Sequence, residues 1–532
     1  MKKKLLQSSP FISFALVLVL LSSGCARAPK QKVFVLGIDG LTFDLLVPWA
    51  KEGKLPNFAK LLEEGSSTQL ISAVPPSSPP AWTSAVTGVN PGKHGIFGFV
   101  KGLKFSAGKH HDLIHDLYYY TSRDRRADPL WVILSERGRR SVVMNVPCSS
   151  PPDRMKGVMI SGFPHTSQTN FTYPPEYRFK IPDYRNDIYG QIVQINGEEA
   201  FLEDMNDIMD RRATVVFKLL EEESWELFFV VFTIADRVQH YFWKFMDPKH
   251  PNWDPVKAQL YSNIVLETYQ RLDQVVGKLR PKLDSQTTLV LMSYHGFGPV
   301  YQLVNGQNFI DQAVPRDVFR VMAADHFGAS FHLTSKKDPP YDSKTREAYA
   351  QTKELLKSKL EQLRDPATGQ KVISKVFEGD ELYWGPYANV APDLLGLETE
   401  GYLFWNWNPT EDGRLFPLHD DPIFSRFFSA YHKMNGVLII TGANVQRGVN
   451  NFDAQIADIA PSVLYLLGEP IPQEMDGRIL DAPISHEYLE DHPLDARWAR
   501  SSKPRQTSGL SDSTEAINKF IEEQLRAIGY VQ

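Results

Sequence analysis

Four short apolar segments constrain how this 532-residue chain can fold, because each is a candidate buried strand beside a potential metal ligand. The segments are residues 33–38, 227–233, 287–293 and 436–441. Short, continuous apolar runs are typical of strands that are covered on both faces, as in parallel sheets. Ligands of open α/β sheets bind outside the carboxyl ends of the strands, so side chains from distant segments can meet there.

The residues that flank these segments are carboxylates, imidazoles and one phenol. They are Asp39 after the first segment, Asp236 and His240 after the second, Tyr294 and His295 after the third, and His432 before the fourth. Asp236 and His240 are four residues apart, which on a helix places both on one face. Each residue alone has an ordinary structural explanation, such as a solvated helix face or an Asp-Gly turn. Together, carboxylates and imidazoles at several strand ends predict a hydrolytic metal centre.

Ser78 is the candidate nucleophile. Proline favours the first position of a helix, so Pro79 predicts a helix over residues 79–87 that stops at Gly88, with Ser78 as its N-cap. A hydroxyl at this position faces free backbone N–H groups that can bind an anionic phosphoryl group, although a simple capping role is the alternative. No Gly-x-Ser-x-Gly motif surrounds Ser78. Activation by a metal therefore fits better than activation by a histidine triad.

Composition and strand order predict an α/β protein. The chain is 42% hydrophobic with a net charge of −5 and has no basic stripe, so nucleic-acid binding is not expected. Strands alternating with amphipathic helices predict a three-layer α/β/α sandwich around a mostly parallel sheet. We expect a core in residues 32–298 and 384–482, a cap-like insertion in residues 299–383, a linker in residues 483–511 and a docking helix in residues 512–532.

The N-terminus has the pattern of a targeting segment. Three lysines precede an apolar stretch too short to span a bilayer, which predicts a signal peptide over residues 1–24. Small residues before Cys25 resemble a bacterial lipobox, which implies lipidation of Cys25 and a tether over residues 25–31. A plain signal peptide with an incidental cysteine is the alternative. The lipobox predicts a lipid-anchored protein of the bacterial cell envelope that faces the periplasm or the exterior.

The motifs in this order resemble the alkaline phosphatase superfamily, in particular the type I phosphodiesterase/nucleotide pyrophosphatase branch. The most specific motifs are Gly37-Ile38-Asp39-Gly40, the block of residues 78–96, Asp236 to His240, Ser293 to Pro299, and Met475-Asp476-Gly477-Arg478. The resemblance spans residues 32–480. It implies an alkaline phosphatase-like fold and a metal-dependent hydrolase of phosphate esters, with diesters favoured over monoesters.

The resemblance also implies two divalent metal ions, expected to be Zn²⁺. Asp236, His240 and His432 would bind one ion. Asp39, Ser78 and an aspartate-histidine pair that includes His295 would bind the other. Ser78 would attack phosphorus to form a covalent intermediate that water then hydrolyses. Phe99 stands where nucleotide pyrophosphatases commonly have a phosphate-contacting asparagine, which argues against a nucleotide substrate.

Tyr294 departs from the family motif. The motif reads Ser-Asp-His-Gly, whereas this chain has Ser293-Tyr294-His295-Gly296. A phenol ionises about six pKa units above a carboxylic acid, so it binds a cation less readily at neutral pH. Three outcomes are open: Tyr294 binds metal as a phenolate, the site is weakened to one metal, or turnover is lost. The last outcome defines an alternative function, a non-catalytic lipoprotein that keeps the fold as a binding or scaffold module.

Overall fold

The computed structural model describes residues 31–103, 117–186, 193–314, 319–323, 328–335, 343–406, 413–417, 428–494, 499–500 and 515–527. The predicted signal peptide and Cys25 lie outside the described residues, as does all of the predicted tether except residue 31. Within the described ranges, no helix combines the length and hydropathy that crossing a membrane requires.

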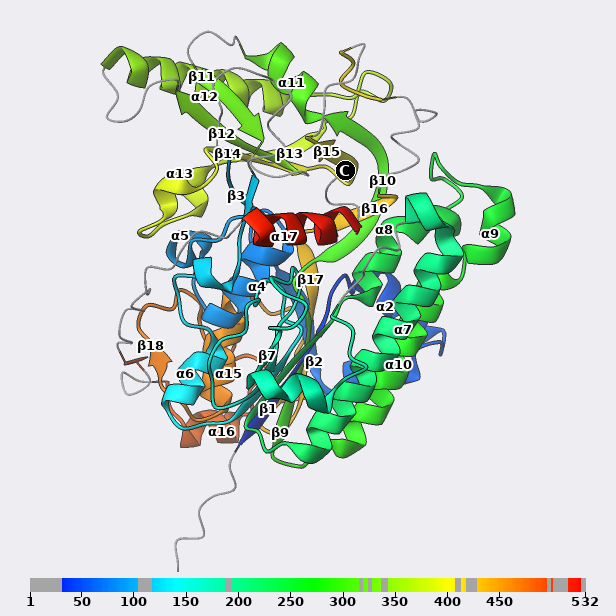
Figure 1. The fold of residues 1–532 in the computed structure, drawn as a ribbon, viewed down its shortest axis with the longest axis vertical. Helices are drawn as coiled ribbons and strands as arrows, with labels where there is room; N and C mark the ends of the chain where they lie inside the picture. The colour runs from blue at the N-terminus through cyan, green and yellow to red at the C-terminus, as the bar shows by residue number, and fades with distance from the viewer. Residues whose placement is uncertain are drawn as a thin grey trace, which may run out of the picture.

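An eight-stranded sheet forms the middle of the molecule (Figure 1). In spatial order its strands are β2 (Ser66–Ile71), β17 (Asn435–Gly442), β9 (Thr287–Ser293), β1 (Lys32–Ile38), β8 (Leu227–Phe232), β5 (Ser141–Met144), β6 (Gly157–Ile160) and β7 (Thr172–Tyr173). The five strands from β9 to β6 are parallel, whereas β17 is antiparallel to both of its neighbours and β7 is antiparallel to β6. The prediction of a mostly parallel sheet that includes all four apolar segments is therefore confirmed.

Helices cover both faces of this sheet (Figure 1). One face packs against α2 (Phe43–Lys51), α3 (Pro56–Glu64), α7 (Val193–Glu222), α8 (Ile234–Met246) and α10 (Ile264–Leu279), and the other against α4 (Ser78–Thr87), α6 (Leu130–Glu136), α15 (Ile459–Leu466) and α16 (His486–Asp491). Side chains alternate along β1, so Phe34 and Leu36 join the first core while Val33 and Val35 join the second. The three-layer α/β/α sandwich is confirmed.

The direction of β17 places the start of this strand at the carboxyl edge of the parallel strands. Val437, near the start of β17, pairs with Ser293 at the end of β9. A residue that precedes β17 therefore lies at the same edge of the sheet as residues that follow β1, β8 and β9. This arrangement explains how His432 joins residues that come after their strands.

The chain between β9 and β17 builds two smaller sheets at one end of the molecule (Figure 1). One contains β15 (Gly401–Trp405), β10 (Gly296–Asn305) and β16 (Ala430–Lys433), and the other contains β11 (Phe319–Ala323), β12 (Ala329–Ser335), β14 (Leu394–Glu398) and β13 (Ile373–Glu378). With α11 (Gly306–Ala313) and α12 (Ser343–Gln362), they enclose a separate core. The predicted return to the main core at residue 384 is too early, because β14 and β15 pair with strands of this region.

Part of the predicted linker is helical in the described residues. Helix α16 falls within residues 483–511, and its Tyr488 is buried and donates a hydrogen bond to the Tyr465 carbonyl at 3.0 Å. Helix α17 (Glu515–Ala527) buries Ile521 and Leu525 against the core, and Gln524 hydrogen-bonds the backbone of His165. The remaining elements are α5 (Pro91–His94), β3 (Val100–Leu103), β4 (Leu117–Tyr119), α9 (Pro255–Tyr261), α13 (Gly379–Leu382), β18 (Ile471–Pro472), β19 (Ala499–Arg500) and five short 3₁₀ helices.

Candidate metal centre

The predicted aspartate and histidine ligands come from four separate parts of the fold and gather at the carboxyl edge of the parallel strands. Asp39 follows β1, Asp236 and His240 lie in α8 after β8, His295 lies between β9 and β10, and His432 lies in β16. Two groups of side chains have ligand atoms that all lie within 4.8 Å of one another: Asp236, His240 and His432, and Asp39, Asp236 and His295. Asp236 belongs to both groups.

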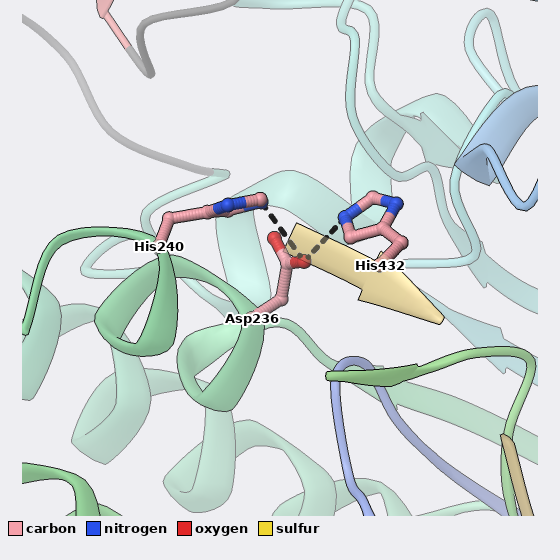
Figure 2. A group of neighbouring side chains, drawn as sticks. All are labelled: Asp236, His240 and His432. Carbon is pink, nitrogen blue, oxygen red and sulfur yellow. Dashed lines mark hydrogen bonds and ion pairs between the residues drawn. The ribbon is translucent and has the colours of Figure 1, made fainter. Parts of the chain in front are cut away.

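Asp236 lies at the middle of the cluster (Figure 2). Its Oδ1 atom is 3.1 Å from His432 Nε2, 3.3 Å from His240 Nε2 and 3.6 Å from His295 Nε2. His295 Nε2 also lies 3.1 Å from Asp39 Oδ1. Three imidazole nitrogens and two carboxylates therefore face a common space, as the sequence suggested.

The opposite ring nitrogen of each imidazole is held by the backbone. The Nδ1 atoms of His240, His295 and His432 lie 2.9, 2.7 and 2.8 Å from the carbonyl oxygens of Ala430, Gly296 and Pro76 respectively. Because a carbonyl only accepts hydrogen bonds, Nδ1 carries the proton in each case and donates it. In its neutral form each ring directs the lone pair of Nε2 toward the cluster, which is the arrangement that metal-binding histidines use.

Burial and charge favour neutral imidazoles beside an ionised carboxylate. Burial lowers the pKa of His240, and burial together with the nearby His432 holds the pKa of His295 well below its usual value. Burial alone acts to raise the pKa of Asp236, but the neighbouring His240 and His432 outweigh it and hold that pKa well below its usual value. An ionised carboxylate and neutral imidazoles are the protonation states that bind a cation.

Gly40 lets the β1 and β8 ends approach each other. Its φ is +81°, and a Cβ atom there would lie 2.7 Å from the backbone Cα of Asp236. The Asp236 N–H donates to the Asp39 carbonyl at 3.0 Å across this contact. A glycine is therefore required both by the backbone conformation and by the space between the two acidic residues.

Ser78 contacts the cluster through Tyr294. Ser78 Oγ lies 2.7 Å from the Tyr294 hydroxyl, and the Tyr294 ring centroid is 4.3 Å from that of His295. Tyr294 is fully buried. The side chain at the family's aspartate position therefore forms a hydrogen bond with the candidate nucleophile.

The prediction that Ser78 is the N-cap of α4 is wrong by one residue. Ser77 has the extended conformation of a cap, and Ser78 is the first helical residue. The Ser78 hydroxyl bonds Tyr294 across the site, and Ser77 makes no side-chain capping bond. Gly88 ends the helix with φ of +70°, as predicted. Pro79 and Pro80 have no backbone N–H and the Ala81 N–H donates to the Ser77 carbonyl, so the first turn of α4 favours an anion here through the Ser78 N–H and the helix dipole.

Arg237 was missed by the sequence interpretation. Its side chain is buried, with Nη1 3.2 Å from Asp236 Oδ2 and the guanidinium 5.0 Å from the Phe163 ring centroid. This contact holds the Asp236 oxygen that faces away from the imidazoles. An arginine next to an aspartate on a helix normally indicates a solvated surface. Only the burial of α8 shows that Arg237 is instead an internal partner of Asp236.

The donor set fits a divalent metal ion. Imidazole nitrogens with fixed tautomers and buried carboxylates are ligands that Zn²⁺ and related cations prefer. Without a cation, the cluster would bury two carboxylates with one nearby guanidinium, which is costly in a dry site. The residues present therefore match the chemistry of a metal centre.

The sequence matches the type I phosphodiesterase/nucleotide pyrophosphatase family over residues 33–412. A search of curated protein sequences finds no significant match. Among solved structures, human ectonucleotide pyrophosphatase/phosphodiesterase 5 is similar, with a TM-score of 0.49 at 15% identity, covering 87% of this chain and 99% of that one.

Two structures of the murine protein of the same name are also similar. One has a TM-score of 0.50, and the other, an inactive variant in complex with AMP, has a TM-score of 0.49. Both are 14% identical and cover 87% of this chain and 100% of the other. At this identity the likeness concerns the fold alone. The family match over most of the sequence identifies the chain as a member of the type I phosphodiesterase/nucleotide pyrophosphatase family and thus as a phosphodiesterase-like phosphoric ester hydrolase.

Proposed function

We propose that this protein is a metal-dependent phosphodiesterase in which Ser78 is the nucleophile. The single observation that carries the proposal is the convergence of three imidazole Nε2 atoms on Oδ1 of Asp236, with Ser78 linked to the same cluster through Tyr294. Diesters are favoured over monoesters. Two divalent ions, Zn²⁺ by the nitrogen-rich ligand set, are the proposed cofactors.

The proposed ligands divide between two positions. Asp236, His240 and His432 would bind the first ion, and Asp39, His295 and Ser78 the second, with Tyr294 beside it. Bound ions at these positions would lower the pKa of a hydroxyl and neutralise the charge that develops on the phosphoryl oxygens.

The chain's own residues supply nucleophilic attack and orientation. The Ser78 hydroxyl gives up its proton as Oγ attacks phosphorus, the ester bond to the leaving alkoxide breaks, and that alkoxide takes up a proton and departs as an alcohol, which leaves the phosphoryl group with its other ester on Ser78. Water then cleaves the new bond and releases the product. The positive end of the α4 dipole, with the backbone N–H of Ser78, stabilises charge on the phosphoryl oxygens during both steps. The Tyr294 hydroxyl fixes the direction of Ser78 Oγ.

The proposal is tested by metal content and by turnover of bis-p-nitrophenyl phosphate. We expect bound divalent ions by mass spectrometry after dialysis and turnover that a chelator abolishes and Zn²⁺ restores. Asp236→Asn should lower metal affinity by about 100-fold or more, because it removes the carboxylate common to both groups. Asp210→Asn, an exposed aspartate on α7, is the matched control. Metal-free protein with chelator-resistant turnover would refute the mechanism.

A non-catalytic binding or scaffold module is the second candidate, and Tyr294 is the observation that favours it. A phenol side chain occupies the family's aspartate position and bonds the candidate nucleophile at 2.7 Å. This candidate predicts no bound ion and no turnover in the purified protein. The same metal and turnover measurements therefore distinguish the two functions.

We further propose that the protein is anchored to the bacterial cell envelope by a lipid on Cys25. The lipobox-like sequence before Cys25 supports this proposal. Cys25→Ser should move the protein from the membrane fraction to the soluble fraction and remove the mass of the lipid. A protein that stays soluble with Cys25 intact would contradict it.

A further inference from the structure

A cavity of about 380 Å³ adjoins the candidate metal centre where the core meets the two smaller sheets. Core segments at residues 42–44, 74–77 and 431–435 form one side, and residues 328–330 and 395–403 form the other. Its size is within the range of small-molecule sites. The lining includes residues of β10, β14, β15 and β16.

His432 connects the cavity with the metal centre. Its Nε2 lies 3.1 Å from Asp236 Oδ1, its Nδ1 donates to the Pro76 carbonyl at 2.8 Å, and both His432 and Pro76 line the cavity. Pro76 is two residues before Ser78. A phosphodiester bound at Ser78 could therefore extend one of its ester groups past His432 into this space.

The charges in the cavity do not suit an anionic group. Among the described residues that line it, Lys433 is the single lysine or arginine. Its Nζ is already bound by Asp44 at 2.9 Å and by Glu400 at 2.7 Å. Glu398 adds a further carboxyl group. A nucleotide with additional phosphates would meet more negative than positive charge here.

The remaining lining combines neutral hydrogen-bonding groups and aromatic rings with aliphatic side chains such as Val74, Leu397 and Met434. Gln69, Ser330, Thr399 and Asn435 offer amides and hydroxyls, and Phe43 and Tyr431 offer ring surfaces. Burial raises the pKa of Glu398 to about 7, and its Oε1 accepts a hydrogen bond from the Ala329 N–H at 3.0 Å. Near neutral pH the Glu398 carboxyl group can accept a hydrogen bond from a ligand hydroxyl when ionised or donate one when protonated.

We propose that this cavity binds a hydroxyl-rich, uncharged ester group, so that the substrate is the phosphodiester of a polyol such as glycerol or a sugar. Hydroxyl groups of the ligand match the mixed donors and acceptors of the lining, and its carbon skeleton matches the aromatic rings. This inference rests on the proposed function, because the cavity would select the substrate of the same centre.

Calorimetry on the full chain with Ser78→Ala tests the inference without turnover. The probes are diglyceryl phosphate and dipropyl phosphate, which share carbon number and charge but differ in hydroxyl groups. We expect diglyceryl phosphate to bind at least about tenfold more tightly, which is roughly 1.4 kcal/mol. Glu398→Ala and the milder Glu398→Gln in the same background should reduce this preference, and Glu354→Gln on the exposed face of α12 should leave it unchanged.

Equal affinities for the two probes, or no binding of either, would overturn the inference. A third probe, bis(2-aminoethyl) phosphate, separates recognition of hydroxyl groups from recognition of charge. If this probe binds more tightly than diglyceryl phosphate, the inference is also overturned. Turnover of bis-p-nitrophenyl phosphate and metal content are measured separately on the unmodified chain. Absence of bound metal and of turnover would reject the proposed function. Absence of the preference for diglyceryl phosphate, with metal and turnover present, would reject only this inference.

Discussion

The Ser78 Oγ atom and the Tyr294 hydroxyl lie 2.7 Å apart, so the candidate nucleophile and the residue that departs from the family motif are hydrogen-bonded to each other. The bond joins the first turn of α4 to the end of β9. Tyr294 is fully buried and packs edge-on against Trp82, with ring centroids 5.5 Å apart. Its hydroxyl is therefore fixed in direction, and the Ser78 hydroxyl has a fixed partner.

Replacement of Ser78 should abolish turnover while leaving the fold intact. Ser78→Ala removes the attacking oxygen, and we expect the turnover of bis-p-nitrophenyl phosphate to fall by roughly 10³-fold or more. Ser224→Ala, an exposed serine before β8, is the control and should behave as the unmodified protein does. Circular dichroism verifies the fold of both variants. Undiminished turnover in Ser78→Ala would mean that another group attacks phosphorus.

Restoration of the family's aspartate should strengthen metal binding. Tyr294→Asp places a carboxylate beside Asp39 and His295, and we expect higher affinity for a divalent ion or faster turnover. Tyr294→Phe keeps the ring and removes only the hydroxyl, so it should lose the bond to Ser78 without this gain. Metal content after dialysis and steady-state kinetics measure both effects. No increase in either quantity for Tyr294→Asp would count against the assignment of this position.

A methyl group at Gly40 should disturb both stability and the metal centre. Gly40→Ala brings a Cβ within 2.7 Å of the Asp236 backbone at a φ of +81°, so we expect a loss of about 1–3 kcal/mol of unfolding free energy and weaker metal binding. Gly53→Ala is a matched control, because φ is +75° there and nothing lies within 4 Å of the added carbon. Denaturant unfolding and metal titration measure the two effects. Equal losses in both variants would show that backbone strain alone matters.

Glu398 should make the stability of the protein depend on pH. Burial raises its pKa from 4.5 to about 7, so the folded protein binds more protons than the unfolded chain between these values. Its contribution to the unfolding free energy therefore falls as pH rises from about 4.5 to 7, by about 1–3 kcal/mol, and is constant above that range.

Glu398→Gln cannot ionise, so this part of the pH dependence should disappear from the variant. Urea unfolding at pH 5 and pH 7.5 compares it with the unmodified protein, and Glu354→Gln serves as the control. The same decline with pH in Glu398→Gln and in the unmodified protein would show that other groups cause it.

The sequence predicted the strands and the helix that carry the site better than it predicted which strands pair and where the regions of the chain begin and end. Apolar runs identified β1, β8, β9 and β17, and the Pro79 and Gly88 signals identified α4 within one residue. The prediction failed at residue 384 and in the linker, because strand partners and the burial of Tyr488 depend on contacts between distant segments. Local pattern carries no information about which strands pair.

The sequence by itself determined which residue types flank the strands, and so the possibility of a metal centre. Its apolar runs identify the buried strands, and the acidic and histidine residues stand close to those runs. Only the tertiary structure decided how these residues meet. The antiparallel direction of β17 brings the preceding His432 to the same edge as Asp39 and Asp236, and burial of α8 converts Arg237 into a partner of Asp236. Packing also set the hydrogen bond between Tyr294 and Ser78, since that contact joins residues 216 positions apart.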